Sequence, residues 1–65
     1  MTLPTVEELS PGTRIRIKGC RGEMVVLQNN WVADLFFNPP SLSELAPGTQ
    51  AEQFHDGLTW KNFDN

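Results

Sequence analysis

Cysteine and histidine are nearly missing from this chain of 65 residues. Cys20 has no second cysteine with which to form an intrachain disulfide, and His55 is the only histidine. A structural zinc site needs four Cys, His or carboxylate ligands at recognisable spacings, and the chain shows no such signature. We therefore expect no metal or other cofactor. The small domain is then stabilised neither by an intrachain disulfide nor by a bound metal, the two features that commonly stabilise very small domains.

Long apolar runs are missing as well. No apolar stretch approaches the roughly 20 residues that a membrane-spanning helix needs, and no basic segment followed by an apolar one opens the chain. We therefore expect a cytoplasmic protein with no membrane contact. The length predicts one small domain over residues 1–65. Folding of such a chain buries only about 60% of the surface of the unfolded chain, so we expect a low stability. A partner that binds only the folded form, including a second copy in a homo-oligomer, would add stability.

Positive charge is scarce but concentrated. The chain has five Lys and Arg residues against eight Asp and Glu residues, a net charge of −3 and a sequence pI of about 4.8. Such a balance argues against wrapping duplex nucleic acid, which requires a basic surface. Four of the five cations nevertheless lie within eight positions that hold no acid, and they are Arg14, Arg16, Lys18 and Arg21.

The segment from Thr13 to Lys18 alternates between cationic and apolar residues. Successive side chains of a strand point to opposite sides, so the pattern predicts a strand with Ile15 and Ile17 on one side and three cations on the other. A row of this kind suits an acidic protein surface or successive phosphates, because the arginine guanidinium binds carboxylates and phosphates equally. The alternative is a solvated face that keeps the sheet soluble and discourages edge pairing.

Two segments have the spacing of a helix capping box and precede a Pro-Gly turn. Thr5–Glu8 predicts a short helical turn, and Ser41–Glu44 repeats the spacing. Residues 8–13 and 44–49, which contain the turns, match at five of six positions. The match indicates either a duplicated unit or a common helix-stop turn used twice. We prefer the second interpretation, because the second unit is too short to stack as a repeat.

Residues 23–28 form an apolar, β-branched run that predicts a strand, and Asn29-Asn30 predicts a tight turn into a further strand over residues 31–37. A two-residue turn places Val26 opposite Ala33 and leaves both sides of the hairpin largely apolar. One side packs into the interior, and the other needs cover from residues 39–46, from the last hairpin or from another chain. This second side is expected to contain Val25, Leu27, Val32 and Phe36.

Residues 50–62 are compatible with two structures. Thr49-Gln-Ala-Glu52 has the spacing of a helix start, whereas Asp56-Gly57 is a strong hairpin signal. We prefer the hairpin, which is expected to pair Glu52 with Lys61 across the two strands.

Five short strands with little helix predict an all-β fold, namely a small five-stranded barrel with short helical turns. Leu9-x-Pro-Gly-Thr-Arg-Ile-Arg-Ile-Lys-Gly19, followed by Gly22-Glu-Met-Val-Val26, resembles the strand-loop-strand of KOW-type and other Src-homology-3-like barrels. The opening is also similar to the Leu-x-Pro-Gly entry of the small barrel domains of ferrous-iron transport. The resemblance implies a Src-homology-3-like barrel and carries no family function.

The aromatic residues and the thiol each allow a structural and a functional interpretation. Trp31 and Trp60 are either bulk of the core or platforms for a nucleobase or a partner's proline. Cys20 lies beside Arg21, whose charge favours the thiolate, and His55 is the only histidine able to act as its base. No third residue that would orient His55 can be identified, so a thiol enzyme is the third hypothesis and we expect no enzymatic activity.

The first hypothesis is a non-catalytic protein–protein interaction module, an adaptor or accessory subunit of a larger assembly. The cationic strand face orients the encounter with an acidic protein surface, and an apolar patch of the hairpin supplies desolvated contact area. The alternative is a KOW-like nucleic-acid-binding barrel in which the same cations bind phosphates. The residues expected at the partner contact are Arg14, Arg16, Lys18, Arg21, Val32, Phe36, Trp31 and Trp60.

Overall fold

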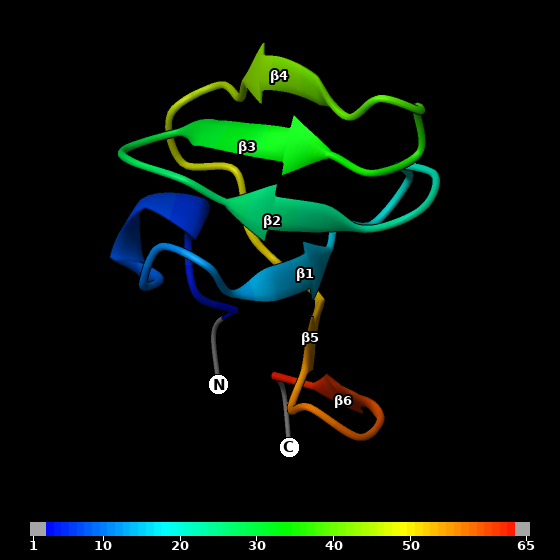
Figure 1. Ribbon diagram of the computed structural model, residues 1–65. Helices are drawn as coiled ribbons and strands as arrows, with labels where there is room; N and C mark the ends of the chain where they lie inside the picture. The colour runs from blue at the N-terminus through cyan, green and yellow to red at the C-terminus, as the bar shows by residue number, and fades with distance from the viewer. Residues whose placement is uncertain (1–2, 64–65) are drawn as a thin grey trace.

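The computed structural model of the chain describes residues 3–63, and nearly all of its regular structure is β. Six antiparallel strands form one sheet in the order β4-β3-β2-β1-β5-β6 (Figure 1). A short 3-10 helix, η1, precedes the first strand and lies beside β1 and β2. The elements are η1 (Val6–Glu8), β1 (Arg14–Arg16), β2 (Met24–Val26), β3 (Trp31–Asp34), β4 (Ser41–Glu44), β5 (Gln53–His55) and β6 (Trp60–Asn62).

The predicted all-β class is confirmed, with six strands where five were expected. The unexpected strand is β4, for which capping-box spacing had indicated a helical turn, and that expectation is wrong. β4 pairs with β3 along its whole length, from Trp31 opposite Glu44 to Asp34 opposite Ser41. Pairing with β3 satisfies backbone groups that a single helical turn leaves without partners. Within the described residues β4 and β6 are the two edges of the sheet, and the sheet does not close on itself.

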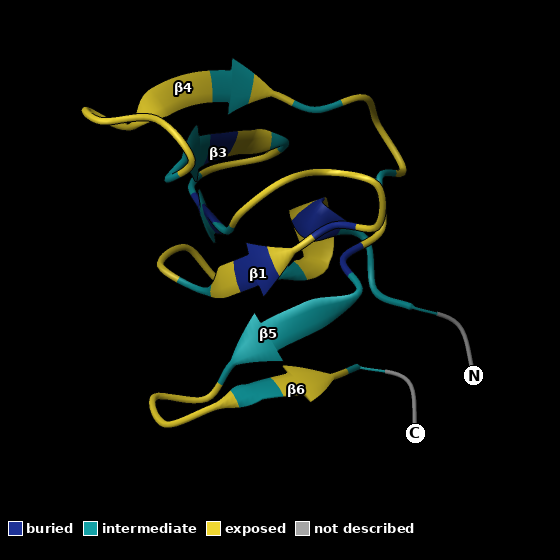
Figure 2. Ribbon diagram, turned by 90° about the vertical axis from the view of Figure 1, so that its right-hand side faces the viewer, coloured by how far each residue is buried: buried dark blue, intermediate teal, exposed yellow. Residues whose placement is uncertain are grey.

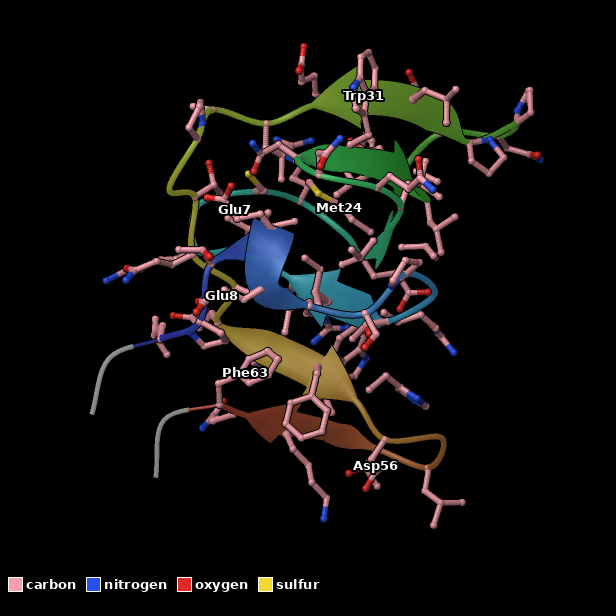
Figure 3. All side chains as sticks on the ribbon, turned by 90° about the vertical axis from the view of Figure 1, so that its left-hand side faces the viewer. Glu7, Glu8, Met24, Trp31, Asp56 and Phe63 are labelled. Carbon is pink, nitrogen blue, oxygen red and sulfur yellow. The ribbon has the colours of Figure 1, made fainter. Side chains whose placement is uncertain are left out.

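The register gathers the buried apolar side chains on one side of the sheet, called the inner face. Ile15 lies opposite both Met24 and Phe54, and Val26 lies opposite Val32. Figure 3 shows Met24 pointing between the strands and η1, and Figure 2 shows buried segments in η1, β1 and β3, in the middle of the molecule. The core consists of Val6, Ile15, Ile17, Met24, Val26, Val32 and Ala51.

The first predicted helical turn is confirmed. The carboxylate of Glu8 accepts hydrogen bonds from the backbone N–H of Thr5 at 2.8 Å and from its hydroxyl at 3.0 Å. These bonds satisfy a backbone donor at the start of η1 and hold Val6 against the inner face, where it is fully buried.

The two Pro-Gly turns have the same hydrogen bonds. The backbone N–H and the hydroxyl of Thr13 both donate to the carbonyl of Ser10, and those of Thr49 both donate to the carbonyl of Ala46. One turn follows a 3-10 helix and the other follows a strand. This difference supports the interpretation of one turn used twice over that of a duplicated unit.

The β2–β3 hairpin turns at the predicted Asn29-Asn30 pair, and Asn29 has a φ of 57°. Its register, however, differs from the prediction. The N–H of Leu27 donates to the carbonyl of Trp31 at 2.8 Å, and the N–H of Trp31 donates to the carbonyl of Gln28 at 3.0 Å. Leu27 and Gln28 therefore both oppose Trp31, which makes a β-bulge beside the turn.

The bulge shifts the pairing by one residue and changes which side chains face the core. Val26 lies opposite Val32 instead of Ala33, and Val32 is fully buried. The expectation that Val32 lies on the second, uncovered side of the hairpin is therefore wrong. A one-residue change of register moves a side chain to the other face of a sheet, so Ala33 takes that place.

Residues 53–62 form the predicted hairpin and no helix. Its register again differs, because Lys61 lies opposite Phe54 and not opposite Glu52. The turn lies one residue further along than expected, at Gly57 and Leu58, because the N–H of Asp56 donates to the carbonyl of Thr59 at 3.1 Å. One carboxylate oxygen of Asp56 also accepts the backbone N–H groups of Leu58 and Thr59. Among residues 3–63, no helix is long and apolar enough to cross a membrane.

Candidate interaction surface

The side of the sheet opposite the core, called the outer face, carries cationic and apolar side chains in one row. Arg14 lies opposite Val25, Val25 opposite Ala33, and Ala33 opposite Leu42. Directly opposed residues project to the same side, so these side chains cross the sheet from β1 to β4 as neighbours. The row is therefore cationic at β1 and apolar toward β4.

Trp60 is the centre of the cationic end. The guanidinium carbon of Arg16 lies 4.1 Å from the centroid of the Trp60 ring, and that of Arg14 lies 6.0 Å away. The ring of His55 meets Trp60 edge-on, with centroids 5.3 Å apart. The attraction between a cation and the face of an indole holds Arg16 in one position above the sheet. The group of Arg14, Arg16, His55 and Trp60 is called the arginine–tryptophan cluster.

Strand order explains how this cluster forms. β5 lies next to β1, and Arg16 pairs with Gln53, while His55 pairs with Trp60 in the adjoining hairpin. A contact between the first and last strands depends on pairing across most of the chain length, so the local sequence pattern did not reveal it. The Asp56-Gly57 hairpin signal predicted a turn between His55 and Trp60, but it could not place either residue beside Arg16.

The four predicted cations differ in their surroundings. Arg14 binds the carboxylate of Glu23, with its Nη2 atom 2.7 Å from Oε1 and 3.0 Å from Oε2. Within residues 3–63, Arg16, Lys18 and Arg21 have no such ion pair. The charge of Arg14 is thus partly compensated inside the chain, and the other three cations are available to an external anion.

Arg21, in the loop between β1 and β2, lies beside a second aromatic group, which belongs to the loop between β3 and β4. Its guanidinium carbon is 5.9 Å from the ring centroid of Phe36, which is 52% exposed. Phe36 packs in turn against Phe37, edge-on, with centroids 5.2 Å apart. The predicted residues Arg21 and Phe36 are therefore brought together, away from the arginine–tryptophan cluster.

The apolar end of the outer face is an open hollow beside β4. It is lined by Leu27, Gln28, Asn29, Trp31 and Leu42. Trp31 is 42% exposed and Leu42 is 67% exposed, and Figure 3 shows Trp31 at the β4 end of the sheet. Leu42 was missed as a candidate because its segment was expected to be helical, although the alternation Ser-Leu-Ser-Glu around it has the period of a strand.

Cys20 and His55 share no hydrogen bond in the described part of the chain. Cys20 is an exposed free cysteine in the loop between β1 and β2. The Nδ1 atom of His55 accepts a hydrogen bond from the backbone N–H of Gly57 at 3.1 Å, within its own hairpin. Among residues 3–63, no three His, Cys, Asp or Glu side chains lie close enough together to hold a metal ion.

No family model matches the chain, and comparisons with curated proteins and with solved structures found no match. The candidate surface is therefore interpreted from its geometry and chemistry alone.

Proposed function

We propose that this chain is a non-catalytic protein–protein interaction module, a cytoplasmic adaptor or accessory subunit that docks its outer face on an acidic surface of a partner protein. One observation carries the proposal. Arg16 is held 4.1 Å above Trp60 on a face whose neighbouring strands present apolar side chains that the core does not use. Arginine and tryptophan are among the residues most enriched at the energetic centres of interfaces.

The cluster favours binding because it reduces the entropy lost on association. A free arginine side chain must give up many rotamers to make a bidentate contact, whereas Arg16 is already restrained by Trp60. Lys18 and Arg21, which have no ion pair within residues 3–63, add to the positive field that orients an acidic partner, which changes the association rate more than the affinity. Val25, Ala33 and Leu42 then supply apolar contact area next to the charged end.

A KOW-like nucleic-acid-binding barrel is the second candidate, and two observations count against it. Base stacking requires a free aromatic face, and the guanidinium of Arg16 lies over Trp60. The net charge of −3 also repels a polyphosphate backbone. Trp31 remains exposed, but it lies at the other end of the sheet, beside Glu44.

We also infer that the sheet is an open relative of the Src-homology-3-like barrel expected from the sequence. The inference is supported by the strand order, in which β1 to β4 follow one another and β5 returns to pair with β1. Such a return bends the sheet around one core, which is what a small barrel of this kind requires.

The function is tested with a charge-neutralising pair of variants. Arg16→Gln and Lys61→Gln each remove one positive charge, but Lys61 belongs to the β5–β6 hairpin and pairs with Asp56 at 3.3 Å. The probe is a capped peptide of alternating glutamate and leucine, titrated into the isotope-labelled chain and followed by NMR. We expect shifts of the Trp60 indole signal, roughly tenfold weaker binding by Arg16→Gln, and unchanged binding by Lys61→Gln.

The competing candidate is tested in the same experiment with single-stranded oligothymidylate and oligouridylate at two salt concentrations. Binding of either oligonucleotide with a steep salt dependence, without binding of the acidic peptide, would replace the proposed function by nucleic-acid binding. Equal losses in Arg16→Gln and Lys61→Gln would show that net charge, and not the arginine–tryptophan cluster, controls binding.

A further inference from the structure

β4 is an edge strand with unused backbone groups. The N–H of Leu45 donates to the carbonyl of Asn30 at 2.8 Å, and in an antiparallel ladder alternate residues direct their N–H and C=O groups to the same neighbour. Ser43, two residues away, therefore faces β3, whereas Leu42 and Glu44 direct their backbone groups away from it. β3 is the only neighbour of β4 in the described sheet, so four backbone groups are available at this edge.

The side chains at this edge define what kind of segment it accepts. Leu42 and Glu44 both project on the outer face, because they lie opposite Ala33 and Trp31. Leu42 forms one wall of the hollow, and Glu44 is exposed and has no ion-pair partner among residues 3–63. The edge thus combines one apolar contact, one uncompensated negative charge and four backbone groups.

We propose that β4 binds an extended segment of a partner protein as an additional antiparallel strand of the sheet. The segment carries an apolar side chain opposite Leu42 and a basic side chain two residues earlier, opposite Glu44. Backbone hydrogen bonds to Leu42 and Glu44 hold the strand, and the side chains select its sequence, as in other cases of strand addition. This site does not use the arginine–tryptophan cluster, although Leu42 also belongs to the apolar row of the proposed docking surface.

Charge and register make a second copy of this chain a poor occupant. A two-fold axis at Ser43 uses all four backbone groups but places the carboxylate of Glu44 against the apolar Leu42 of the other copy. An axis at Leu42 places Pro40, which has no N–H, opposite Glu44. An axis at Glu44 opposes two carboxylates directly, and each copy has a net charge of −3. A foreign basic segment meets none of these penalties.

The probe for this proposal is a capped heptapeptide of threonine residues in which one position is lysine and the position two residues later is valine. It is titrated into the isotope-labelled chain by NMR up to millimolar concentration. We expect signals of residues 42–44 and the Trp31 indole to shift, while the Trp60 indole does not. The absence of any shift at β4 would overturn the proposal.

Two N-methylated forms of the same peptide provide a matched control. Methylation of the lysine and valine nitrogens removes the donors that face β4, so binding is expected to disappear. Methylation of the flanking threonine nitrogens removes donors that face away, so binding is expected to persist. Equal binding of the two forms would show that the peptide contacts side chains only, which would overturn strand addition.

The charge of the edge is tested with Glu44→Lys, and Glu7→Lys is its matched control because Glu7 is exposed on η1, away from the edge. Glu44→Lys is expected to bind the lysine peptide at least fivefold more weakly and to regain binding when the peptide's lysine is replaced by glutamate. Glu7→Lys is expected to behave as the wild type.

Concentration-dependent dimerisation of the wild-type chain in sedimentation, abolished by Glu44→Lys, would instead assign the edge to a second copy and overturn the proposal. Binding of the acidic peptide at Trp60 is expected to survive Glu44→Lys, so the two sites fail independently.

Discussion

The carboxylate of Asp56 organises the turn that carries Trp60 back toward β1. Its Oδ1 atom accepts the backbone N–H groups of Leu58 at 2.8 Å and Thr59 at 2.9 Å, and its Oδ2 atom lies 3.3 Å from Nζ of Lys61. The N–H of Thr59, followed by that of Leu58, lowers the pKa of Asp56 from 3.8 to about 2. Hydrogen bonds of this kind stabilise the ionised form of a carboxylate.

The lowered pKa predicts a defined loss of stability in acid. Asp56 has a lower pKa in the folded chain than in the unfolded chain, so its contribution is complete only well above pH 3.8 and is lost as the pH falls toward 2. Asp56→Asn keeps an acceptor oxygen but has no titrating charge. The difference in Tm between the wild type and this variant is therefore expected to shrink between about pH 5 and about pH 2.

The measurement is thermal unfolding over this pH range, with NMR titration of the Asp56 carboxyl. The pKa of Glu8 is also lowered, because the backbone N–H of Thr5 donates to it, but Glu8 is present in both proteins and cancels in the difference. An Asp56 titration midpoint at or above 3.8 would contradict the role given to the turn.

At the level of the strands, alternation predicted the two sides of residues 13–18 correctly, but it could not predict registers, and the wrong register of the next hairpin put Val32 on the wrong face. Ile15 and Ile17 are buried, whereas Arg14, Arg16 and Lys18, which alternate with them, are exposed, because period two determines which side each residue takes. The β2–β3 register depends on one extra residue at Gln28, and no local pattern marks such a bulge. The contact of Arg16 with Trp60 depends on non-local pairing of β1 with β5, so the centre of the candidate surface was likewise beyond local sequence analysis.

The loops between β1 and β2 and between β3 and β4 meet at Gly22. Gly22 has a φ of 68°, and a Cβ atom there would lie 3.3 Å from Cβ of Phe36. Gly19, in the same loop, has a φ of 84° and no atom within 4 Å of such a Cβ. The two glycines therefore both have a positive φ but differ in what a Cβ atom would contact.

This pair predicts unequal effects of substitution by alanine. Gly19→Ala is expected to cost about 1 kcal/mol, because an L residue is strained in the left-handed region. Gly22→Ala is expected to cost more, since it must also displace Phe36 and with it the contact to Arg21. Urea unfolding of both variants measures the difference, and equal losses would contradict the loop contact.

For the whole molecule, the proposed function implies that the two faces of the sheet divide stability from binding. The buried core has seven side chains, and those contributed by strands all lie on the inner face. A chain of this size has a stability of only about 3–10 kcal/mol, so each core residue accounts for a large share of it. The arginine, tryptophan and leucine side chains of the outer face are not part of this core, and the proposed docking uses them.

Val25 and Val26 test this division, because they are neighbours of the same residue type on opposite faces of β2. Val26 is fully buried against Val32, whereas Val25 is partly exposed between Arg14 and Ala33. Val26→Ala is expected to lower the free energy of unfolding by about 2 kcal/mol and the Tm by roughly 10 °C.

Val25→Ala is expected to cost less than about 1 kcal/mol, because Val25 already contacts solvent. It should instead weaken binding of the acidic glutamate–leucine peptide, since it removes apolar area next to the arginine–tryptophan cluster. Thermal unfolding and the NMR titration measure the two effects on the same samples. If Val25→Ala destabilised the chain as much as Val26→Ala, the outer face would be a second core that needs its own cover within the fold, and its apolar row could not be assigned to a partner.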